Sequence, residues 1–422
     1  MEVLIKKARI IDPNSSMNGL VKDILISNNK IERIEDSISD QNVKKCIEAK
    51  ALNVSPGWFD FRVCFGEPGY EVRETLDSGV NAALRGGFTG ALMQPLTAPV
   101  IDNAAMVQFI NQRHDKKIFD LQVAPSASLG SKGSALAELH DMHLTGVKAF
   151  TNAVGSAYNA DFVKKCLEYC QTFDGLLIQF SDTISLSKNR FVSEGETSVQ
   201  IGFHGVPSIA ESSAINQYIQ ILEYLGTGRL HFSSVSTKES VEEIKRAKDK
   251  GLNVTCDVNG MNILFNDTKY FEFDANFKVY PPLRSEENRR ALISALNEGV
   301  IDVICSDHNP QNIERKKVEF EYASFGVSML DTFYSAYNTM LSTELPIEKY
   351  VECVAINPRK ILGLDVPVIE VNKEANVTFF DSDFKYKVTE GKMHSKSKNS
   401  PFIGETLRGK SLGVINNGKM VS

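Results

Sequence analysis

The sequence lacks any run of lysines and arginines that would neutralise a phosphate backbone. Its 47 basic and 53 acidic side chains give a formal net charge of −6. Proteins that bind nucleic acid or an anionic membrane surface concentrate positive charge on one segment or face. We therefore predict no nucleic-acid and no membrane partner, and expect a small molecule or a protein instead.

Cysteine is scarce, and long apolar runs are absent. Seven cysteines, an odd number, are spread from Cys46 to Cys353, which does not suit the disulfide framework of a small secreted domain. No run approaches the roughly 20 apolar residues of a membrane-spanning helix, and the N-terminal residues do not resemble a cleavable signal peptide. We expect a cytoplasmic protein with reduced thiols.

Apolar runs of strand length alternate with helical patterns through the middle of the chain. The predicted strands cover residues 58–65, 88–93, 118–123, 146–150, 175–180, 229–235, 252–258 and 301–306. Eight strands separated by helices predict an α/β fold, a (β/α)₈ TIM-type barrel over residues 55–364, with any site at the C-terminal strand ends.

The two ends of the chain differ in style from the middle. Residues 1–54 and 365–422 are rich in short strand patterns and turns, with Asn28-Asn29 at a predicted hairpin tip. We predict that both termini join in one small composite β-sandwich domain. The segment HSKSKNS at 394–400 is predicted to be a flexible loop.

The stretch SPGWFDFRVCFGEPG at 55–69 is the strongest pointer to a site. Large apolar residues alternate there with three polar or reactive ones, Asp60, Arg62 and Cys64. Successive side chains of a strand point to opposite faces, so these three share one side. A strand that directs an acid, a base and a thiol to one side is a candidate floor for an active site.

This stretch resembles the opening strand of the dihydroorotases in the amidohydrolase superfamily, whose pattern is P-G-x-x-D-x-H-x-H-x-R-E-P-G. The shared residues are Pro56, Gly57, Asp60, Glu67, Pro68 and Gly69. Arg62 and Cys64 stand where the pattern has two metal-binding histidines, and Gly66 where it has a substrate-binding arginine. The frame of the motif is kept while these functional groups are replaced.

The resemblance continues along most of the chain, beginning with GGFT at residues 86–89. It implies further replacements of three kinds. Two acids of a metal-binding segment are replaced by an amide and a methyl group, two histidine ligands by an amide and a hydroxyl, and two substrate-binding asparagines by a leucine and a tyrosine. These positions are, in that order, Asn152 and Ala153, Gln179 and Ser234, and Leu96 and Tyr280.

Other family positions keep their residues. Asp307-His308 matches the T-D-H motif, so the resemblance implies metal ligation and proton transfer for Asp307, and substrate contact for His308. Arg284 ends the motif K-x-N-P-P-L-R, which implies substrate binding, and His231 is also retained. A simpler interpretation makes Asp307-His308 a relic held by hydrogen bonds, and His231 a satisfied core histidine.

The family is expected to bind zinc, but we predict no metal cofactor here. A catalytic zinc needs about three protein ligands and an open position, and of the family's ligand positions only Asp307 keeps its residue. Arg62 adds a permanent positive charge where a cation would lie. Because the first and last strands of a closed barrel are neighbours, we predict an ion pair between Arg62 and Asp307. A thiol-based site that uses Cys64 with His231 or His308 is a further alternative.

Two main functions follow from the resemblance. The first is a catalytically inactive dihydroorotase homologue with a structural or regulatory role, partnering aspartate transcarbamoylase by family analogy and forming a homo-oligomer. The alternative is an active cyclic amide hydrolase that interconverts dihydroorotate and N-carbamoyl-aspartate through a remodelled site. A third hypothesis is a module that binds an anionic metabolite beside Arg62 or Arg284.

Overall fold

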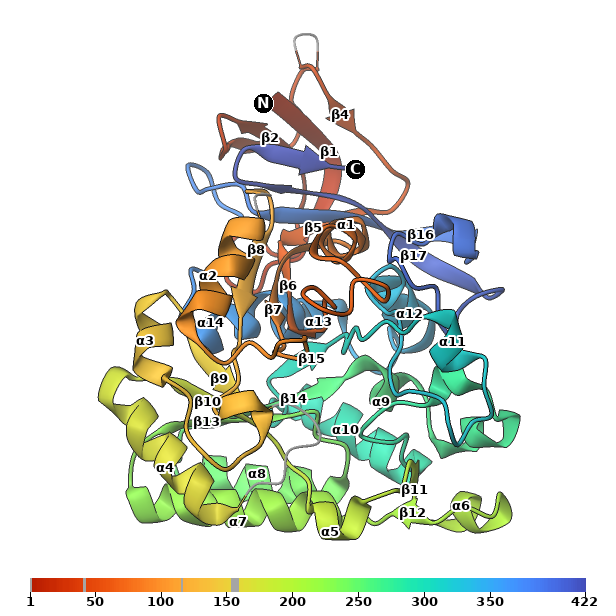
Figure 1. Cartoon of the computed structure of the whole chain (residues 1–422). Coiled ribbons are helices and arrows are strands. Elements are labelled where there is room, and N and C mark those ends of the chain that lie inside the picture. Colours follow the sequence, from red (N-terminus) through yellow and green to blue (C-terminus); the bar gives the residue numbers. More distant parts are fainter. Residues whose placement is uncertain (1, 41–42, 115–116, 153–158) are drawn as a thin grey trace.

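The computed structural model describes residues 2–40, 43–114, 117–152 and 159–422 and has two parts, a barrel and a terminal sheet (Figure 1). All eight predicted barrel strands are present. They are β6 (Trp58–Val63), β7 (Phe88–Met93), β8 (Asp120–Val123), β9 (Ala149–Thr151), β10 (Leu176–Phe180), β13 (Arg229–Ser233), β14 (Val254–Asn259) and β15 (Val303–Cys305). Several are shorter than predicted, because buried apolar residues such as Ile118 and Ile301 flank the paired segments.

The barrel closes between its first and last strands. β6, β7 and β8 form one parallel group, and β9, β10, β13, β14 and β15 form another. Parallel bridges from Val63 to His308 and from Ser126 to Thr151 join the two groups. Side chains at the C-terminal ends of β6 and β15 therefore lie next to each other.

Helices surround the barrel. They are α1 (Leu76–Gly86), α2 (Ala104–Arg113), α3 (Leu139–Leu144), α4 (Ala160–Cys170), α5 (Ile184–Ser187), α6 (Glu196–Gln200), α7 (Ile209–Leu225), α8 (Lys238–Asp249), α9 (Gly260–Leu264), α10 (Glu286–Glu298), α11 (Ile313–Lys316), α12 (Phe333–Met340), α13 (Ile347–Val351) and α14 (Asn357–Leu362). In α1, Thr75 caps the N-terminus, and Gly87 ends the helix with a φ of 101°, a conformation that favours glycine.

Strands from both termini form one eight-stranded sheet at the top of Figure 1. The N-terminal strands are β1 (Glu2–Ile10), β2 (Val21–Ser27), β3 (Lys30–Glu35), β4 (Cys46–Ile47) and β5 (Leu52–Pro56), and the C-terminal strands are β16 (Val377–Lys387), β17 (Thr406–Asn416) and β18 (Lys419–Val421). β5 pairs with β16, so the joining of the two ends is confirmed. Asn28 and Asn29, with φ of 48° and 66°, form the predicted tip of the β2–β3 hairpin.

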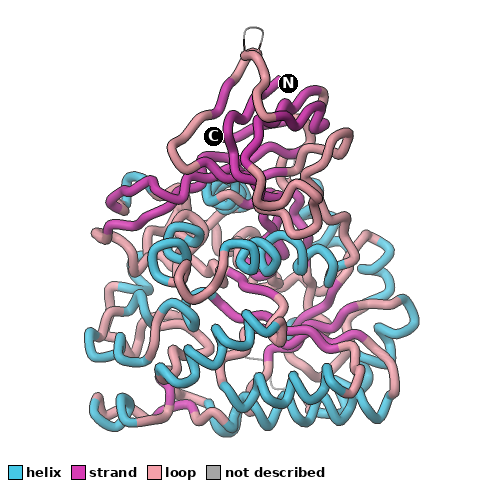
Figure 2. The backbone as a smooth tube through the Cα atoms, turned by 180° about the vertical axis from the view of Figure 1, so that it is seen from behind, coloured by secondary structure: helices cyan, strands magenta, loops and turns pink. Residues whose placement is uncertain are grey.

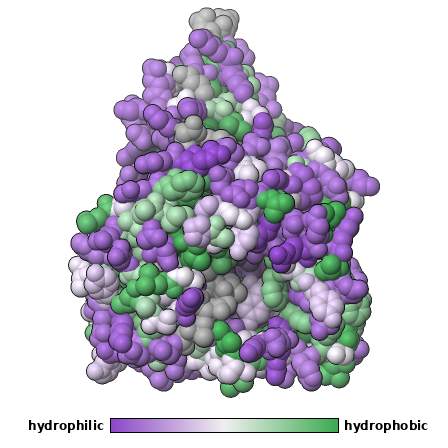
Figure 3. Space-filling model, in the orientation of Figure 1, coloured by the Kyte–Doolittle hydropathy of each residue, from purple (hydrophilic) through white to green (hydrophobic). Residues whose placement is uncertain are grey.

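The strand ends of β16 and β17 extend beyond this sheet as a two-stranded ribbon, seen from behind in Figure 2. α12 packs against β17, and Asn338 donates hydrogen bonds to the carbonyls of Ser382 and Arg408 at 3.0 Å each. Figure 3 shows a largely hydrophilic surface over this ribbon. The contact fixes the ribbon against the side of the barrel.

The segment 394–400 is irregular, but it is held in place rather than free in solvent. Ser395 is fully buried and donates to the Glu74 carboxylate, and Ser397 donates to the carbonyl of Arg73 at 2.7 Å. The prediction of a flexible loop rested on its polar composition. That composition is explained by hydrogen bonds to residues far away in the sequence.

Candidate functional site

Arg62 crosses the interior at the C-terminal ends of the barrel strands. Its Nε donates to Asp307 Oδ1 at 2.7 Å, and its Nη1 donates to Ser233 Oγ, at the end of β13, at 2.8 Å. Arg62 is only 2% exposed and Asp307 9% exposed. The predicted ion pair between the first and last strands is confirmed.

Asp60 connects the backbones of the two strand ends that carry this ion pair. Its Oδ1 accepts from the backbone nitrogens of Arg62 and Ser306, each at 3.1 Å. Its Oδ2 is buried and has no hydrogen-bond partner in the part of the chain that the structure describes. Burial raises the pKa of Asp60 to about 6, because the charged form loses its hydration.

The charge of Arg62 is fixed by its surroundings. Burial opposes the charged form, but Asp307 and the nearby Asp257 raise the pKa of Arg62 above its ordinary value. A guanidinium in this setting stays protonated at every pH at which the protein is folded. The barrel therefore carries a permanent cation at the level where the family's metal-binding residues are expected.

His231 and Asp257 form a second buried pair on neighbouring strands. His231 Nε2 lies 3.0 Å from Asp257 Oδ2, and its Nδ1 lies 2.8 Å from Thr255 Oγ1. Burial opposes ionisation of Asp257, but the hydrogen bond and charge of His231 lower the pKa of Asp257 below its usual value. His231 is thus a satisfied core histidine, and Asp257 is a site residue that sequence reasoning missed.

His308 faces the barrel wall. Its Nδ1 accepts from the backbone nitrogen of Met329 at 3.1 Å, so its proton lies on Nε2, 3.5 Å from Glu74 Oε2. Burial would raise the pKa of Glu74, but hydrogen bonds from His308 and Ser395 lower it. Glu74 was missed from sequence, since two of its partners, His308 and Ser395, are more than two hundred residues away. Substrate contact by His308 stays a prediction.

The guanidinium of Arg284 contacts other groups of the protein, and the residue is only 3% exposed. Its Nε donates to Ser236 Oγ at 3.0 Å, its Nη1 donates to the Val206 carbonyl at 2.8 Å, and its Nη2 lies 3.8 Å from Glu211 Oε2. These contacts join the loop after β13 to α7 and to β12 (Gly205–Val206). The predicted role in substrate binding is not tested by this arrangement.

Gly66 leaves no space for a side chain. A Cβ built on it would lie 2.4 Å from the carbonyl oxygen of Tyr70 and 2.9 Å from that of Glu74. An arginine at this position, as in the resembling motif, would require the backbone of 70–74 to move. Leu96, the next replaced position, is half-buried in the loop after β7.

Three of the remaining replaced positions lie at the ends of β9, β10 and β13 or just beyond them. Asn152, Gln179 and Ser234 are all buried, and Gln179 donates to the Phe180 carbonyl at 3.3 Å. Tyr280 is half-buried and donates to Asp182 Oδ2 at 2.7 Å. Ala153 lies outside the described residues.

Cys64 is poorly suited to act as a nucleophile. The side chain is 7% exposed, and burial raises the pKa of its thiol to about 12. The thiolate is the reactive form of cysteine. At neutral pH very little of Cys64 is therefore in the thiolate form, which argues against the alternative of a thiol-based site.

The donor set at these strand ends does not fit a catalytic zinc. Among the described residues, no group of three or more histidine, cysteine or acidic side chains is placed to hold a metal ion. Zinc prefers thiolate, imidazole and carboxylate ligands, whereas Arg62, Gln179 and Ser234 offer a cation, an amide and a hydroxyl. The Arg62 guanidinium also occupies the coordination space of Asp307 Oδ1.

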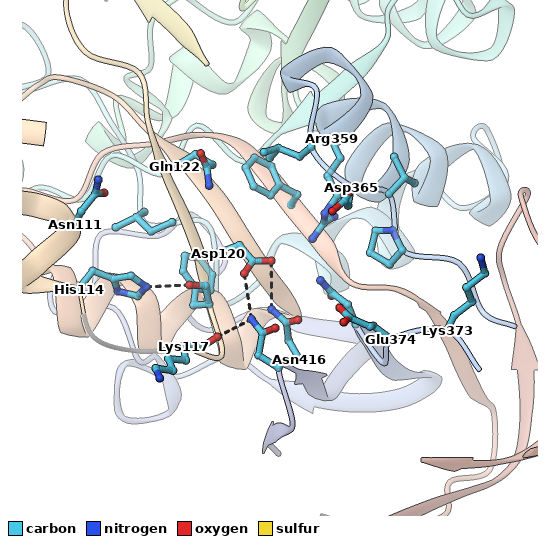
Figure 4. Close-up of a pocket in the computed structure, with 18 of the residues that line it drawn as sticks. Asn111, His114, Lys117, Asp120, Gln122, Arg359, Asp365, Lys373, Glu374 and Asn416 are labelled. Carbon is cyan, nitrogen blue, oxygen red and sulfur yellow. Dashed lines mark hydrogen bonds between the residues drawn. The ribbon is translucent and has the colours of Figure 1, made fainter. Parts of the chain in front are cut away.

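A large cavity lies at the opposite end of the strands, between the barrel and the terminal sheet (Figure 4). Its volume is about 1200 Å³. Asp120, at the start of β8, accepts hydrogen bonds there from Asn416 and Asn417, and Arg359 donates to the Gly57 carbonyl at 2.6 Å. Such contacts at the N-terminal face of a barrel serve stability.

Comparison with known proteins identifies the family. The model of the Amidohydrolase family matches residues 52–421. This chain belongs to the amidohydrolase family. The dihydroorotase of Caldicellulosiruptor saccharolyticus is 37% identical over 425 residues, which cover 99% of this amidohydrolase and 98% of the relative.

Two further comparisons agree. The dihydroorotase of Syntrophus aciditrophicus is 32% identical over 425 residues, which cover 100% of this amidohydrolase and 99% of the relative. The solved L-hydantoinase of Arthrobacter aurescens superimposes with a TM-score of 0.86 at 22% identity and covers 100% of this chain and 96% of that chain. The latter supports the fold. None of the described helices is long and apolar enough to span a membrane.

Proposed function

We propose that this dihydroorotase-like amidohydrolase of the pyrimidine pathway has no hydrolase activity and serves a structural or regulatory role. The observation that supports this is the contact between Arg62 and Asp307, at 2.7 Å. Asp307 is the acid that would transfer protons in the family, and here its Oδ1 already accepts from a permanent cation. A protein that keeps the barrel while Asp307 is paired with a cation is suited to a structural or regulatory role, which depends on the shape of the fold.

Chemical requirements favour the same conclusion. Hydrolysis of a cyclic amide needs an activated water and groups that stabilise the developing oxyanion. Arg62 supplies positive charge, but it donates to Asp307 and Ser233. His231 is buried and hydrogen-bonded to Asp257, and His308 is buried with its Nε2 3.5 Å from Glu74 Oε2. Asp60 Oδ2 has no hydrogen-bond partner among the described residues, but Asp60 is fully buried and closed to solvent.

The proposed partner is aspartate transcarbamoylase, by analogy with members of the dihydroorotase family. The proposed assembly also contains a homo-oligomer of this chain. A net charge of −6 and the absence of a basic block are consistent with a protein partner.

An active cyclic amide hydrolase is the second candidate. Curated dihydroorotases are 31–37% identical to this chain over nearly its full length, and Asp307-His308 keeps the family motif. On this hypothesis Asp307 must exchange its bond to Arg62 for a bond to water when substrate enters.

The deciding experiment combines elemental analysis with a dihydroorotate hydrolysis assay, on protein purified without chelators, with and without added zinc. We expect substoichiometric metal and no turnover. Turnover that disappears in a folded Asp307→Asn variant would contradict the proposal and establish the second candidate. Turnover that persists in that variant would indicate a contaminating enzyme.

The partner is tested separately by light scattering of mixtures with aspartate transcarbamoylase from the same organism. We expect a complex larger than either component. If the mixture contains only particles of the size of the two separate proteins over the micromolar range, the proposed partner is wrong. The proposal of inactivity still depends on the hydrolysis assay.

A further inference from the structure

A cleft of about 500 Å³ lies on the side of the molecule, and its lining includes none of the barrel-mouth residues described above. It is bordered by the end of α1, the start of α12, the β16–β17 ribbon and residues 392–394. No role has been given to it by the resemblance or by the proposed function.

Positive charge dominates this cleft. Lys385, Lys392 and Lys410 line it and are exposed, and Arg85 lines it as well but donates to the main-chain oxygen of Ser422 at 2.5 Å. Within the described part of the chain, none of the three lysines forms an ion pair with a carboxylate, in a protein whose net charge is −6. Like charges gathered without partners create a local potential that attracts an anion.

The one carboxylate in the lining is already used. Asp331 accepts from the backbone nitrogen of His394 at 2.7 Å, from its Nδ1 at 2.9 Å and from the backbone nitrogen of Ser395 at 3.1 Å. These bonds fix the rim of the cleft. Among the described residues, Asp331 forms its ion-pair contact with His394 and none with the lysines.

Aromatic rings stand beside the cations. Phe384 is 43% exposed, and its ring centroid is 6.3 Å from that of Tyr386. Lys410 Nζ lies 5.3 Å from the Phe384 centroid and 5.9 Å from that of Tyr386. An exposed ring beside ammonium groups is the combination on which proteins stack a base while they hold its phosphates.

The floor of the cleft offers an unused hydroxyl. Ser411 is 8% exposed, and its Oγ has no hydrogen-bond partner among the described residues. A buried hydroxyl without a partner costs free energy, which a ligand oxygen would recover only after Ser411 Oγ turns from Gly87 toward the cleft. This observation is independent of the charge and of the rings.

We propose that this cleft binds a nucleoside polyphosphate, with its phosphates on Lys385, Lys392 and Lys410 and its base against Phe384. A neutral ligand would leave the cations unpaired, and inorganic phosphate alone would leave the ring uncovered. The site is separate from the barrel mouth, so it does not depend on whether the chain hydrolyses dihydroorotate.

The test is isothermal titration of the full chain with ATP, UTP, pyrophosphate and adenosine. We expect both nucleotides to bind more tightly than pyrophosphate, and adenosine to bind least. Because stacking on an aromatic ring contributes about tenfold in affinity, Phe384→Ala should weaken ATP by about that factor and leave pyrophosphate unchanged.

Two double charge reversals, one in the cleft and one elsewhere on the surface, give a test and its matched control. Lys385→Glu with Lys410→Glu should weaken ATP by more than about tenfold, whereas Lys132→Glu with Lys188→Glu, at exposed positions elsewhere, should not. Equal weakening by both pairs would reveal unspecific attraction of anions and overturn the proposal. So would adenosine binding as tightly as ATP, or no binding of either nucleotide at millimolar concentration.

Discussion

The Arg62 guanidinium lies 2.7 Å from the Asp307 carboxylate, and both groups are buried. Removing one partner of a buried pair leaves the other charge without compensation and costs about 3–5 kcal/mol. We therefore expect Arg62→Met and Asp307→Asn each to lower the free energy of unfolding in urea by about this amount. The double variant should lose less than the sum of the two. Strict additivity would mean that the two groups do not interact in solution.

Arg284 provides a test of its role as a structural residue. Arg284→Met removes donors from Ser236 and Val206 and a cation from Glu211, so we expect a loss of about 3 kcal/mol in urea unfolding. A variant of unchanged stability that has lost affinity for dihydroorotate would instead assign Arg284 to substrate binding.

The burial of Lys316 predicts that the free energy of unfolding rises with pH. Burial lowers the pKa of Lys316 to about 7 in the folded protein. Between pH 7 and about 10.5 the unfolded chain binds a proton that the folded chain has released, so folding becomes more favourable as pH rises through this window. The difference between wild type and Lys316→Met should therefore grow in favour of wild type from pH 7 to 10.

The exposed neighbour Lys317 is the matched control for that measurement. Its replacement by Met should leave the pH dependence of the unfolding midpoint unchanged. If Lys317→Met and Lys316→Met give the same pH profile, the ammonium of Lys316 is hydrated in solution.

Thiol labelling tests the alternative of a reactive cysteine. Cys46 is the exposed cysteine, whereas Cys64 and the other five are buried. With iodoacetamide at pH 8 we expect mass spectrometry to find Cys46 labelled in the native protein, and the others only after denaturation. Rapid native labelling of Cys64 would favour the thiol-based site.

The frame of the fold is predictable because it depends on local patterns. The alternation in residues 58–65 places Asp60, Arg62 and Cys64 on one side, and the closure of an eight-stranded barrel then brings Arg62 to Asp307. The twin asparagines at 28–29 likewise predict a turn that needs positive φ.

The partners of the site residues are less predictable. Asp257 and Glu74 each lie within an ordinary strand or loop pattern, and their importance comes from His231 and His308, on other elements. The same reason explains segment 394–400, in which the Ser395 hydroxyl and the backbone nitrogen of Lys396 donate to Glu74. A single sequence shows composition, but it does not show which distant group a polar side chain meets.

The position of Arg62 also restricts how this chain could change under mutation. A single replacement of Arg62 by histidine would supply one ligand of the family pattern, but it would leave Asp257 and Asp307 without their cation. The intermediate would be less stable before any metal site was complete, since Gln179 and Ser234 would still differ from the family pattern. A metal site of the family pattern would therefore need several coordinated substitutions in this chain, with the replacement of Arg62 as only one of them.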